Sequence, residues 1–197
     1  MSSSTLENIT PIMRMVMGIK PKSILDIGVG FGKWGHLCRE YLDAWECRVD
    51  KDKWQVQING IEIFRDNIQL HQKHIYDHIF IGDASFLASL TEEEVTPYTL
   101  DCPYDLVLAN DVIEHIEKEK ALALFDELQA RTAKHIICSI PIGKGWLGRP
   151  PSVTKVNPHE DHISSWEVEE MLAMGFTVIH KVHHTRGPIV TFYWKAQ

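Results

Sequence analysis

The chain has 197 residues, of which 44% are hydrophobic and 24% charged, and this composition suits one globular domain with a full core. Its formal net charge of −7 weighs against binding to the phosphate backbone of nucleic acids. No apolar run approaches the roughly 20 residues of a membrane span, and the amino-terminal residues lack the pattern of a secretory signal. We therefore expect a cytoplasmic protein without a membrane span.

The first predicted elements are a helix, a strand and a second helix. Thr10 and Pro11 predict a helix start and Gly18 its end. Residues 23–27 form an apolar run typical of a strand buried on both faces. Apolar residues at helical spacing predict a helix from about Lys33; they are Trp34, Leu37, Cys38 and Tyr41.

The middle of the chain alternates between strands and helices. Apolar segments at 58–64, 78–84, 104–111 and 134–141 predict strands. Between the last two, residues 112–130 place their apolar side chains on one stripe, which predicts a helix packed on the sheet. This alternation favours a parallel sheet.

The last third begins with a long segment, 141–162, that carries glycines and prolines without apolar periodicity. Loops of this length in compact domains tend to be functional, and we interpret this one as a substrate lid. Ser164 and Glu167 then predict a capping box, Ile163 and Val168 a hydrophobic staple, and Gly175 a helix end. Residues 176–182 and 189–195 predict a terminal hairpin.

Three alternate glycines, Gly28, Gly30 and Gly32, lie where the first strand meets its helix. In open parallel sheets ligands bind beyond the carboxyl ends of the strands, and glycine lets a ligand approach the backbone there. The spacing differs from the dinucleotide pattern G-x-G-x-x-G. The turn by itself indicates a small-molecule site of unspecified kind.

Four segments in order resemble the class I S-adenosylmethionine-dependent methyltransferases: 25-LDIGVGFG-32, 61-IEIF-64, 82-GDA-84 and 105-DLVLANDVIEHI-116. The resemblance covers the chain from about Ser23 to the carboxyl terminus. It implies a single methyltransferase domain over residues 1–197, with a doubly wound, Rossmann-like α/β fold. The sheet of this three-layer sandwich is expected to be mostly parallel, with an antiparallel terminal strand.

The resemblance also implies S-adenosylmethionine as cofactor and roles for particular residues. Asp26 and the backbone of residues 28–32 would contact its amino acid portion, and Glu62 its ribose hydroxyls. Asp83 and Ala84 would face the adenine, and Asn110 and Asp111 would lie beside the methionine portion and the methyl group. Carboxylates suit this cofactor because it carries ammonium and sulfonium charges and no phosphate.

The position of the ribose acid leaves an alternative. Glu62 comes 36 residues after Asp26, whereas in dinucleotide folds this acid usually lies about 20 residues past the glycine loop. We interpret residues 44–57 as an insertion. If residues 46–49 are the real second strand, Asp50 is the competing ribose acid.

Sequence features after the fourth strand bear on the acceptor. Residues 110–113 lack the Asn/Asp-Pro-Pro-Tyr/Phe signature of enzymes that methylate amino groups of bases, and 111-DVIEHI-116 looks like the small-molecule branch of the family. In the lid, 159-HEDHISSW-166 offers two histidines and two acids. We favour His162, then His159, as general base for an oxygen nucleophile, with Asp161 or Glu160 orienting the imidazole.

The lid cluster has two other interpretations. Histidine and carboxylate could hold a divalent ion, although the sequence leads us to assign no metal ligand, and solvated loop histidines are common. His115 is interpreted as a structural or cofactor-side residue. The lid also carries four residues that could grip an anionic acceptor or stack on a ring; they are Lys144, Trp146, Arg149 and Lys155.

Two other functions remain as alternatives. The first is a nicotinamide-dependent or nucleotide-sugar oxidoreductase on the same fold, disfavoured by the glycine spacing and by the lack of a Tyr-x-x-x-Lys pair. The second is a noncatalytic module that binds the cofactor or a partner protein, since fold does not fix function. The sequence predicts no particular oligomeric state.

Overall fold

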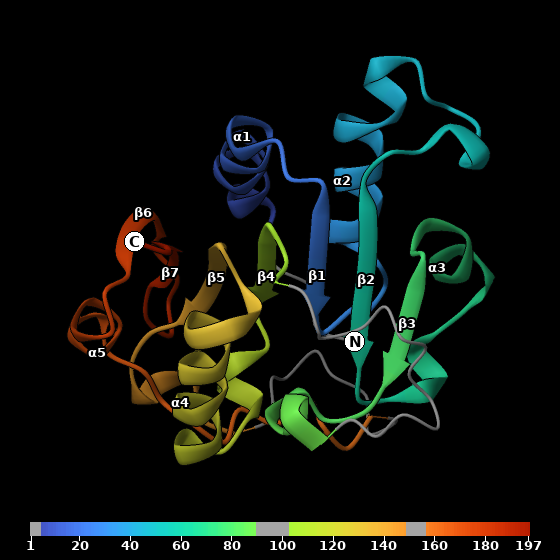
Figure 1. The fold of residues 1–197 in the computed structure, drawn as a ribbon. Helices are drawn as coiled ribbons and strands as arrows, with labels where there is room; N and C mark the ends of the chain where they lie inside the picture. Colours follow the sequence, from blue (N-terminus) through green and yellow to red (C-terminus); the bar gives the residue numbers. More distant parts are fainter. Residues whose placement is uncertain (1–4, 90–102, 149–156) are drawn as a thin grey trace.

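The computed structural model describes residues 5–89, 103–148 and 157–197. These form one seven-stranded sheet in the order β3-β2-β1-β4-β5-β7-β6 (Figure 1). Strands β1 to β5 run parallel, and β7 is antiparallel to both β5 and β6. The predicted fold class, a mostly parallel sheet with an antiparallel end, is confirmed. The strands are β1 (Ser23–Ile27), β2 (Gln57–Glu62), β3 (His78–Ile81), β4 (Leu106–Asn110), β5 (His135–Pro141), β6 (Thr177–Val182) and β7 (Ile189–Lys195).

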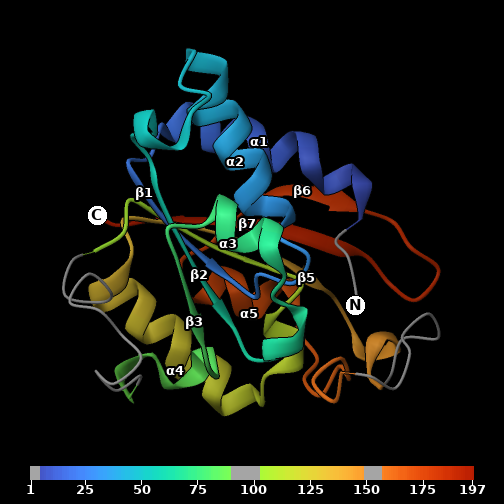
Figure 2. The same ribbon diagram turned by 90° about the vertical axis from the view of Figure 1, so that its right-hand side faces the viewer.

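Helices cover both faces of the sheet, so the chain forms three layers (Figure 2). One face carries α1 (Ile9–Ile19), α2 (Lys33–Leu42) and α3 (Leu70–Ile75). The other carries α4 (Lys118–Glu127) and α5 (Val168–Ala173). Because both faces are covered, the central strands are apolar on both sides, and every residue of β4 is buried. Among the described residues, no helix is long and apolar enough to cross a membrane.

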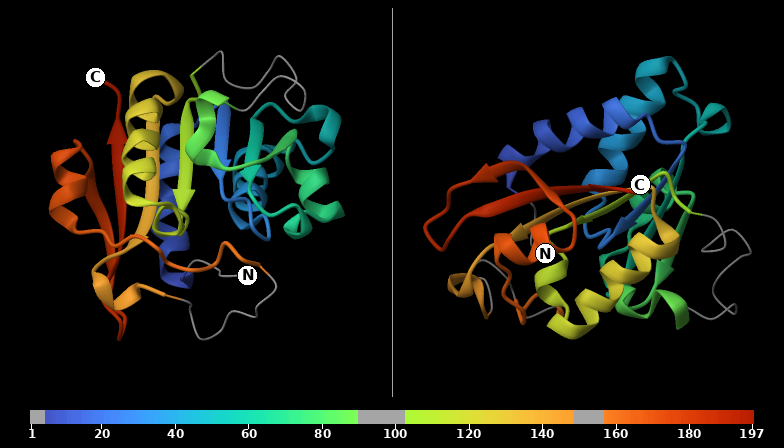
Figure 3. Two further views of the ribbon diagram at one scale, coloured as in Figure 1. Left: turned by 90° about the horizontal axis from the view of Figure 1, so that it is seen from below. Right: turned by 60° about the vertical axis from the view of Figure 1, so that its left-hand side comes forward.

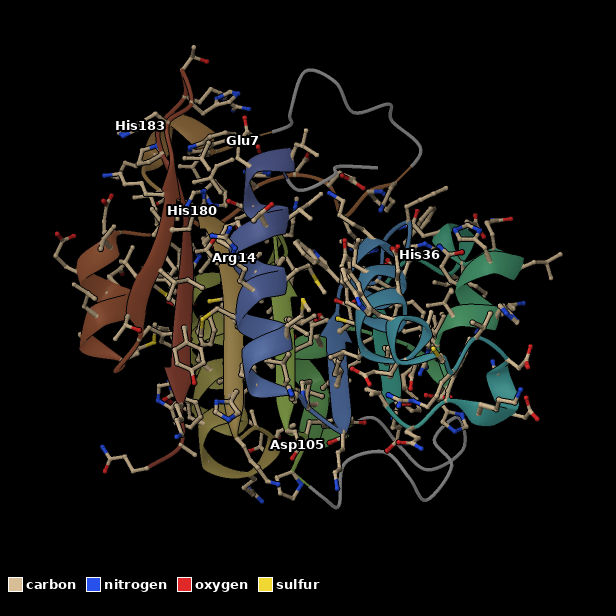
Figure 4. The ribbon with its side chains drawn as sticks, turned by 90° about the horizontal axis from the view of Figure 1, so that it is seen from above. Glu7, Arg14, His36, Asp105, His180 and His183 are labelled. Atoms are coloured by element: carbon tan, nitrogen blue, oxygen red, sulfur yellow. The ribbon has the colours of Figure 1, made fainter. Side chains whose placement is uncertain are left out.

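The helix α1 is fixed to the sheet at its amino-terminal end. Asn8, directly before the helix, is fully buried and donates a hydrogen bond of 2.6 Å from Nδ2 to the Oγ of Ser139 on β5. In Figure 4, α1 crosses the sheet between α2 and the terminal hairpin, with Glu7 on the same side as His180 of β6. The amino-terminal segment is thus bonded to β5 and lies near β6, both in the carboxyl-terminal half of the chain.

Two predicted helix boundaries are wrong. Helix α1 begins at Ile9, before Thr10, and continues through Gly18 until Lys20 adopts a left-handed conformation with φ of 52°. The predicted helix 112–130 begins only at Lys118 and is preceded by a 3-10 turn, Ile113–His115. There the carbonyl oxygen of Glu114 accepts hydrogen bonds from the backbone N–H groups of residues 163 and 164, so it is not available to a helix.

The predicted capping box is also wrong. Ser164 is buried, and its hydroxyl donates to the carbonyl oxygen of Ile113. Glu167 and Glu170 form the capping box of α5 instead, and Gly175 follows the helix with φ of +85°. The two described ends of the predicted lid, residues 141–148 and 157–162, are joined by a bridge between Gly148 and His162.

A matched pair of glycine variants tests how α2 packs on Tyr76. A Cβ on Gly35 would overlap the Tyr76 ring, which is itself buried, whereas a Cβ on Gly18 would meet no atom within 4 Å. We expect Gly35→Ala to lower the free energy of unfolding in urea by about 1–3 kcal/mol. Gly18→Ala, in an exposed helical position, should raise it by about 0.5–1 kcal/mol. Equal effects of the two substitutions would contradict this packing.

Candidate functional site

A cavity of about 380 Å³ lies at the carboxyl ends of β1, β2 and β4. This edge of the sheet faces the viewer in the left panel of Figure 3, where the chain before α5 crosses it. Its volume is within the range of small-molecule sites, and its position is where open parallel sheets bind ligands. The walls come from the glycine turn, the ends of β2, β3 and β4, and residues 157–163.

The glycine turn forms one wall of the cavity. Gly28 and Gly30 line it with φ angles of +78° and +52°, which residues other than glycine rarely adopt. A Cβ on Gly28 would overlap the side chain of Val112, so Val112 packs against the backbone of the turn only because this residue is glycine. Gly32, the third of the predicted residues, does not line the cavity; it begins α2 as its N-cap.

Glu62 lies at the end of β2 and lines the cavity although only 4% of it is exposed. One carboxylate oxygen accepts a hydrogen bond of 2.8 Å from the N–H of Gly30. The other accepts bonds of 2.9 Å from the N–H of Phe64 and 3.2 Å from Nδ2 of Asn67. The carboxylate is therefore held in one orientation, with an edge toward the cavity.

The alternative ribose acid does not reach the cavity. Residues 44–46 form a 3-10 turn and no strand passes through 46–49, so the hypothesis of an earlier second strand is wrong. Asp50 is exposed and pairs with Lys53 at 2.6 Å. The interpretation of residues 44–57 as an insertion before β2 agrees with these placements.

Asp26 is positioned behind the glycine turn and not on the cavity wall. It is 1% exposed, and one of its oxygens accepts a hydrogen bond of 2.5 Å from the hydroxyl of Tyr76. The same hydroxyl accepts a bond from the N–H of Gly35. Burial raises the pKa of Asp26 to about 7, against the opposing effect of the Tyr76 hydrogen bond.

Asp83 and Ala84 follow β3 and line the cavity on the side of Glu62. An oxygen of Asp83 accepts hydrogen bonds from the N–H and the hydroxyl of Ser85, at 2.9 and 2.7 Å. These bonds fix the turn that carries both residues. The predicted adenine-side residues are thus on the cavity wall, and their role remains a prediction.

Asn110 ends β4, Asp111 follows it, and both line the cavity next to the glycine turn. Asn110 is 6% exposed, and neither its side-chain oxygen nor its nitrogen has a partner among the described residues. Buried amides usually have partners, so this pair of atoms is suited to a ligand. Asp111 has φ of +53°, an uncommon backbone conformation for a residue other than glycine, and the chain turns there at the end of the strand.

The histidines of the predicted lid are separated by the fold. His159 is exposed and lines the mouth of the cavity. His162 does not line it; its ring packs edge-on against His115 with ring centroids 4.8 Å apart. Burial, the neighbouring His115 and then Arg186 lower the pKa of His162 to about 4, so this imidazole is neutral at pH 7.

Of the four residues predicted to grip an anionic acceptor, the structure describes two, Lys144 and Trp146. Lys144 is exposed on a 3-10 turn, and Trp146 packs on His184 with centroids 4.8 Å apart; neither lines the cavity. Arg149 and Lys155 lie outside the described residues. Two other lysines line the cavity, Lys33 and Lys120, and supply positive charge there.

Three residues of this region were missed by the sequence analysis. Tyr76 holds Asp26, Glu114 is a buried acid beside His115, and Asn157 lines the cavity. The segment 111-DVIEHI-116 signalled Glu114, but the predicted continuous helix gave its side chain no particular place. Tyr76 carried no signal, because its contact with Asp26 spans 50 residues.

No protein-family profile matches the chain, and no curated protein matches its sequence. Several solved structures match the chain in fold. The amino-terminal domain of EvdMO1 with bound S-adenosylhomocysteine is 12% identical, with a TM-score of 0.64 over 98% of this chain and 83% of that one.

Two further matches are more distant in shape. Magnesium protoporphyrin IX methyltransferase from Synechocystis PCC 6803 with bound S-adenosylmethionine is 14% identical, with a TM-score of 0.53 over 96% and 77%. The methyltransferase domain of a bacterial Hen1 is 15% identical, with a TM-score of 0.55 over 96% of both chains. The chain therefore has the class I S-adenosylmethionine-dependent methyltransferase fold.

The buried Asp26 gives the protein a testable pH dependence. Its folded pKa of about 7 exceeds its ordinary value of 3.8, so the folded chain holds this proton where the unfolded chain has lost it. The stability from this group is full below the unfolded pKa and is lost as pH rises through the folded pKa. Relative to wild type, Asp26→Asn should gain on the order of 1–4 kcal/mol of unfolding free energy between pH 4 and pH 8.

Urea unfolding of both proteins across this pH range measures the difference. Subtracting wild type from variant removes the contribution of all other titrating groups, and Asp50→Asn, at an exposed site, reports the effect of removing a carboxylate from the surface. A difference between Asp26→Asn and wild type that does not change with pH would contradict the assignment.

Proposed function

We propose that the chain binds S-adenosylmethionine in this cavity and transfers its methyl group to a small-molecule acceptor. The observation that carries the proposal is Glu62: a carboxylate at the end of β2, held by Gly30 and Phe64, on the wall of a cavity that begins at the glycine turn. Neighbours in shape that are crystallised with S-adenosylhomocysteine or S-adenosylmethionine support it.

The residues present fit this cofactor. Glu62 would accept the ribose hydroxyls, and Asp83 with Ala84 would border the adenine. The unpartnered amide of Asn110 and the backbone of Gly28 and Gly30 would take the polar amino acid end. Asp26 would not contact the cofactor directly, because it lies behind the glycine turn, where it is hydrogen-bonded to Tyr76.

When bound, the cofactor supplies a methyl carbon already activated by its sulfonium. The chain's task is then to hold the acceptor in line and to keep water out. We propose an oxygen nucleophile, and of the two predicted bases we favour His159, because it lines the cavity mouth while His162 does not. Asp111, which also lines the cavity, would orient the acceptor hydroxyl.

The acceptor we propose is a hydroxyl-bearing small molecule with negative charge. Of the two lysines on the cavity wall, Lys120 pairs with Glu117 at 2.9 Å, so the support for the charge comes from Lys33. The EvdMO1 domain, 13% identical with a TM-score of 0.64, has been crystallised in the presence of S-adenosylhomocysteine and D-fucose, which is in keeping with a hydroxyl acceptor. A nucleic-acid acceptor is disfavoured by the net charge of −7.

Calorimetric titration with S-adenosylhomocysteine tests the cofactor proposal. We expect micromolar binding by wild type and no binding of NAD. Glu62→Gln should weaken binding at least tenfold, or about 1.4 kcal/mol, because an amide offers one acceptor oxygen where the carboxylate offers two.

The matched control is Asp50→Asn, which removes the competing acid from an exposed site and should leave the affinity unchanged. Thermal unfolding of each variant separates lost binding from lost folding. Binding of NAD in place of S-adenosylhomocysteine would overturn the proposal and move the chain to the redox alternative.

A further inference from the structure

Glu114, His115 and His162 lie together beside the cavity, although they come from two distant segments. Glu114 and His115 belong to the 3-10 turn after β4, and His162 to the strand-like segment before α5. One oxygen or ring nitrogen from each lies within 4.8 Å of the other two. We refer to these three residues as the Glu–His–His cluster.

Two atoms of the cluster lack hydrogen-bond partners. Within the part of the chain that the structure describes, neither Oε2 of Glu114 nor Nδ1 of His162 has one. Both side chains are well buried, at 2% and 6% exposure. A buried polar atom without a partner costs free energy, and in native proteins such atoms usually mark an ion, a water molecule or a functional role.

The ring of His115 is oriented for coordination. Its Nδ1 lies 3.1 Å from the carbonyl oxygen of Asp161. A carbonyl oxygen only accepts, so Nδ1 carries the hydrogen and Nε2 presents its lone pair. Metal-bound histidines are typically fixed in this way, with the other ring nitrogen donating to a carbonyl or carboxylate.

The surrounding charges also bear on a cation. Asp111 lies close enough to Glu114 for an electrostatic interaction. Glu160 and Asp161 lie equally within electrostatic range of His115, so carboxylates surround two members of the cluster. Arg186 acts on His162 from the other side and opposes a cation there. Carboxylates therefore outnumber the cation among the charged groups that face the cluster.

We propose that Glu114, His115 and His162 bind one divalent transition-metal ion. Two imidazoles and one carboxylate suit zinc, cobalt, iron or manganese better than calcium or magnesium, which prefer oxygen ligands. Three protein ligands leave coordination positions open. Because His115 also lines the cavity, an open position can take an oxygen of the acceptor and lower the pKa of its hydroxyl.

This role toward the acceptor rests on the proposed methyl transfer, whereas ion binding itself does not. It also gives His162 a function that its position permits. This imidazole does not line the cavity, so it is suited to coordination rather than to proton transfer from the acceptor.

The full chain, stripped with EDTA, should bind one equivalent of Zn²⁺ in a calorimetric titration. Glu114→Gln, which keeps the shape of the side chain, and His162→Asn, which removes the imidazole ring, should each weaken Zn²⁺ binding about 100-fold. The matched controls are Glu169→Gln and His183→Asn, exposed residues away from the cluster, and they should bind as wild type does; Figure 4 labels His183.

Co²⁺ titrated into the wild-type protein provides a second measurement that needs no variant. Visible absorption bands of Co²⁺ held by nitrogen and oxygen ligands are expected, and Zn²⁺ should displace them. The proposal is overturned if wild type binds neither ion at millimolar concentration. It is equally overturned if the two cluster variants bind Zn²⁺ as tightly as the controls.

A parallel titration with S-adenosylhomocysteine separates this proposal from the previous one. We expect Glu114→Gln to retain the wild-type affinity for it. If the wild-type chain binds S-adenosylhomocysteine but no Zn²⁺, the metal site is excluded and the methyltransferase proposal stands. If it binds Zn²⁺ but no S-adenosylhomocysteine, the metal site stands and the methyltransferase proposal is excluded.

Discussion

The hydrogen bond from the backbone N–H of Gly30 to the carboxylate of Glu62 is the constraint on which the cavity depends. This bond joins the turn after β1 to the end of β2. The carboxyl ends of these two adjacent strands line the cavity. From the other side, Nε2 of Gln72 donates to the carbonyl oxygens of Gly30 and Asn67, each at 2.7 Å. Both backbone polar groups of Gly30 are therefore hydrogen-bonded, and as a glycine it has no side chain between its backbone and the cavity.

A second crossing of the chain completes the site. The backbone N–H groups of Ile163 and Ser164 donate to the carbonyl oxygen of Glu114, and the Ser164 hydroxyl donates to that of Ile113. These bonds replace the helical bonds that the turn after β4 would otherwise make. They interrupt the predicted helix, and they bring His162 against His115. The same three contacts thus explain a wrong helix boundary and the formation of the Glu–His–His cluster.

The buried polar groups of the described residues are unevenly satisfied: Arg39 and Asp26 each leave one atom without a partner, Nε and Oδ1, but are bonded through their other atoms. Arg39 and Asp43 are buried and paired at 2.6 Å, and Tyr76 is bonded to Asp26. Such pairs hold α2 and the glycine turn in place. Among the described residues, Asn110 has no partner at either side-chain polar atom, and Glu114 and His162 each keep one unpartnered atom beside the cavity. Burial without partners is costly, so these are the positions where a ligand gains the most.

The sequence by itself determined the strands, the order of the segments and the fold class, because buried parallel strands read as continuous apolar runs and the glycine turn demands backbone angles that few residues adopt. Its resemblance to the methyltransferase family also implied that Gly28, Glu62, Asp83 and Asn110 surround one cofactor, and all four line the same cavity. Local patterns were less informative at helix ends. Thr10 and Ser164 have the residue type of a cap, but in the structure the N-cap positions are occupied by Asn8 and Glu167.

Only the tertiary structure decided which side chains face the cavity and which face one another. Asp26 and Glu62 both looked like cofactor ligands in sequence, yet one lies against Tyr76 behind the turn and the other on the cavity wall. His159 and His162 are three residues apart, yet one lines the cavity and the other packs on His115. Contacts across 40 to 50 residues, such as those of Tyr76 and Asp161, depend on packing of elements that no local pattern encodes.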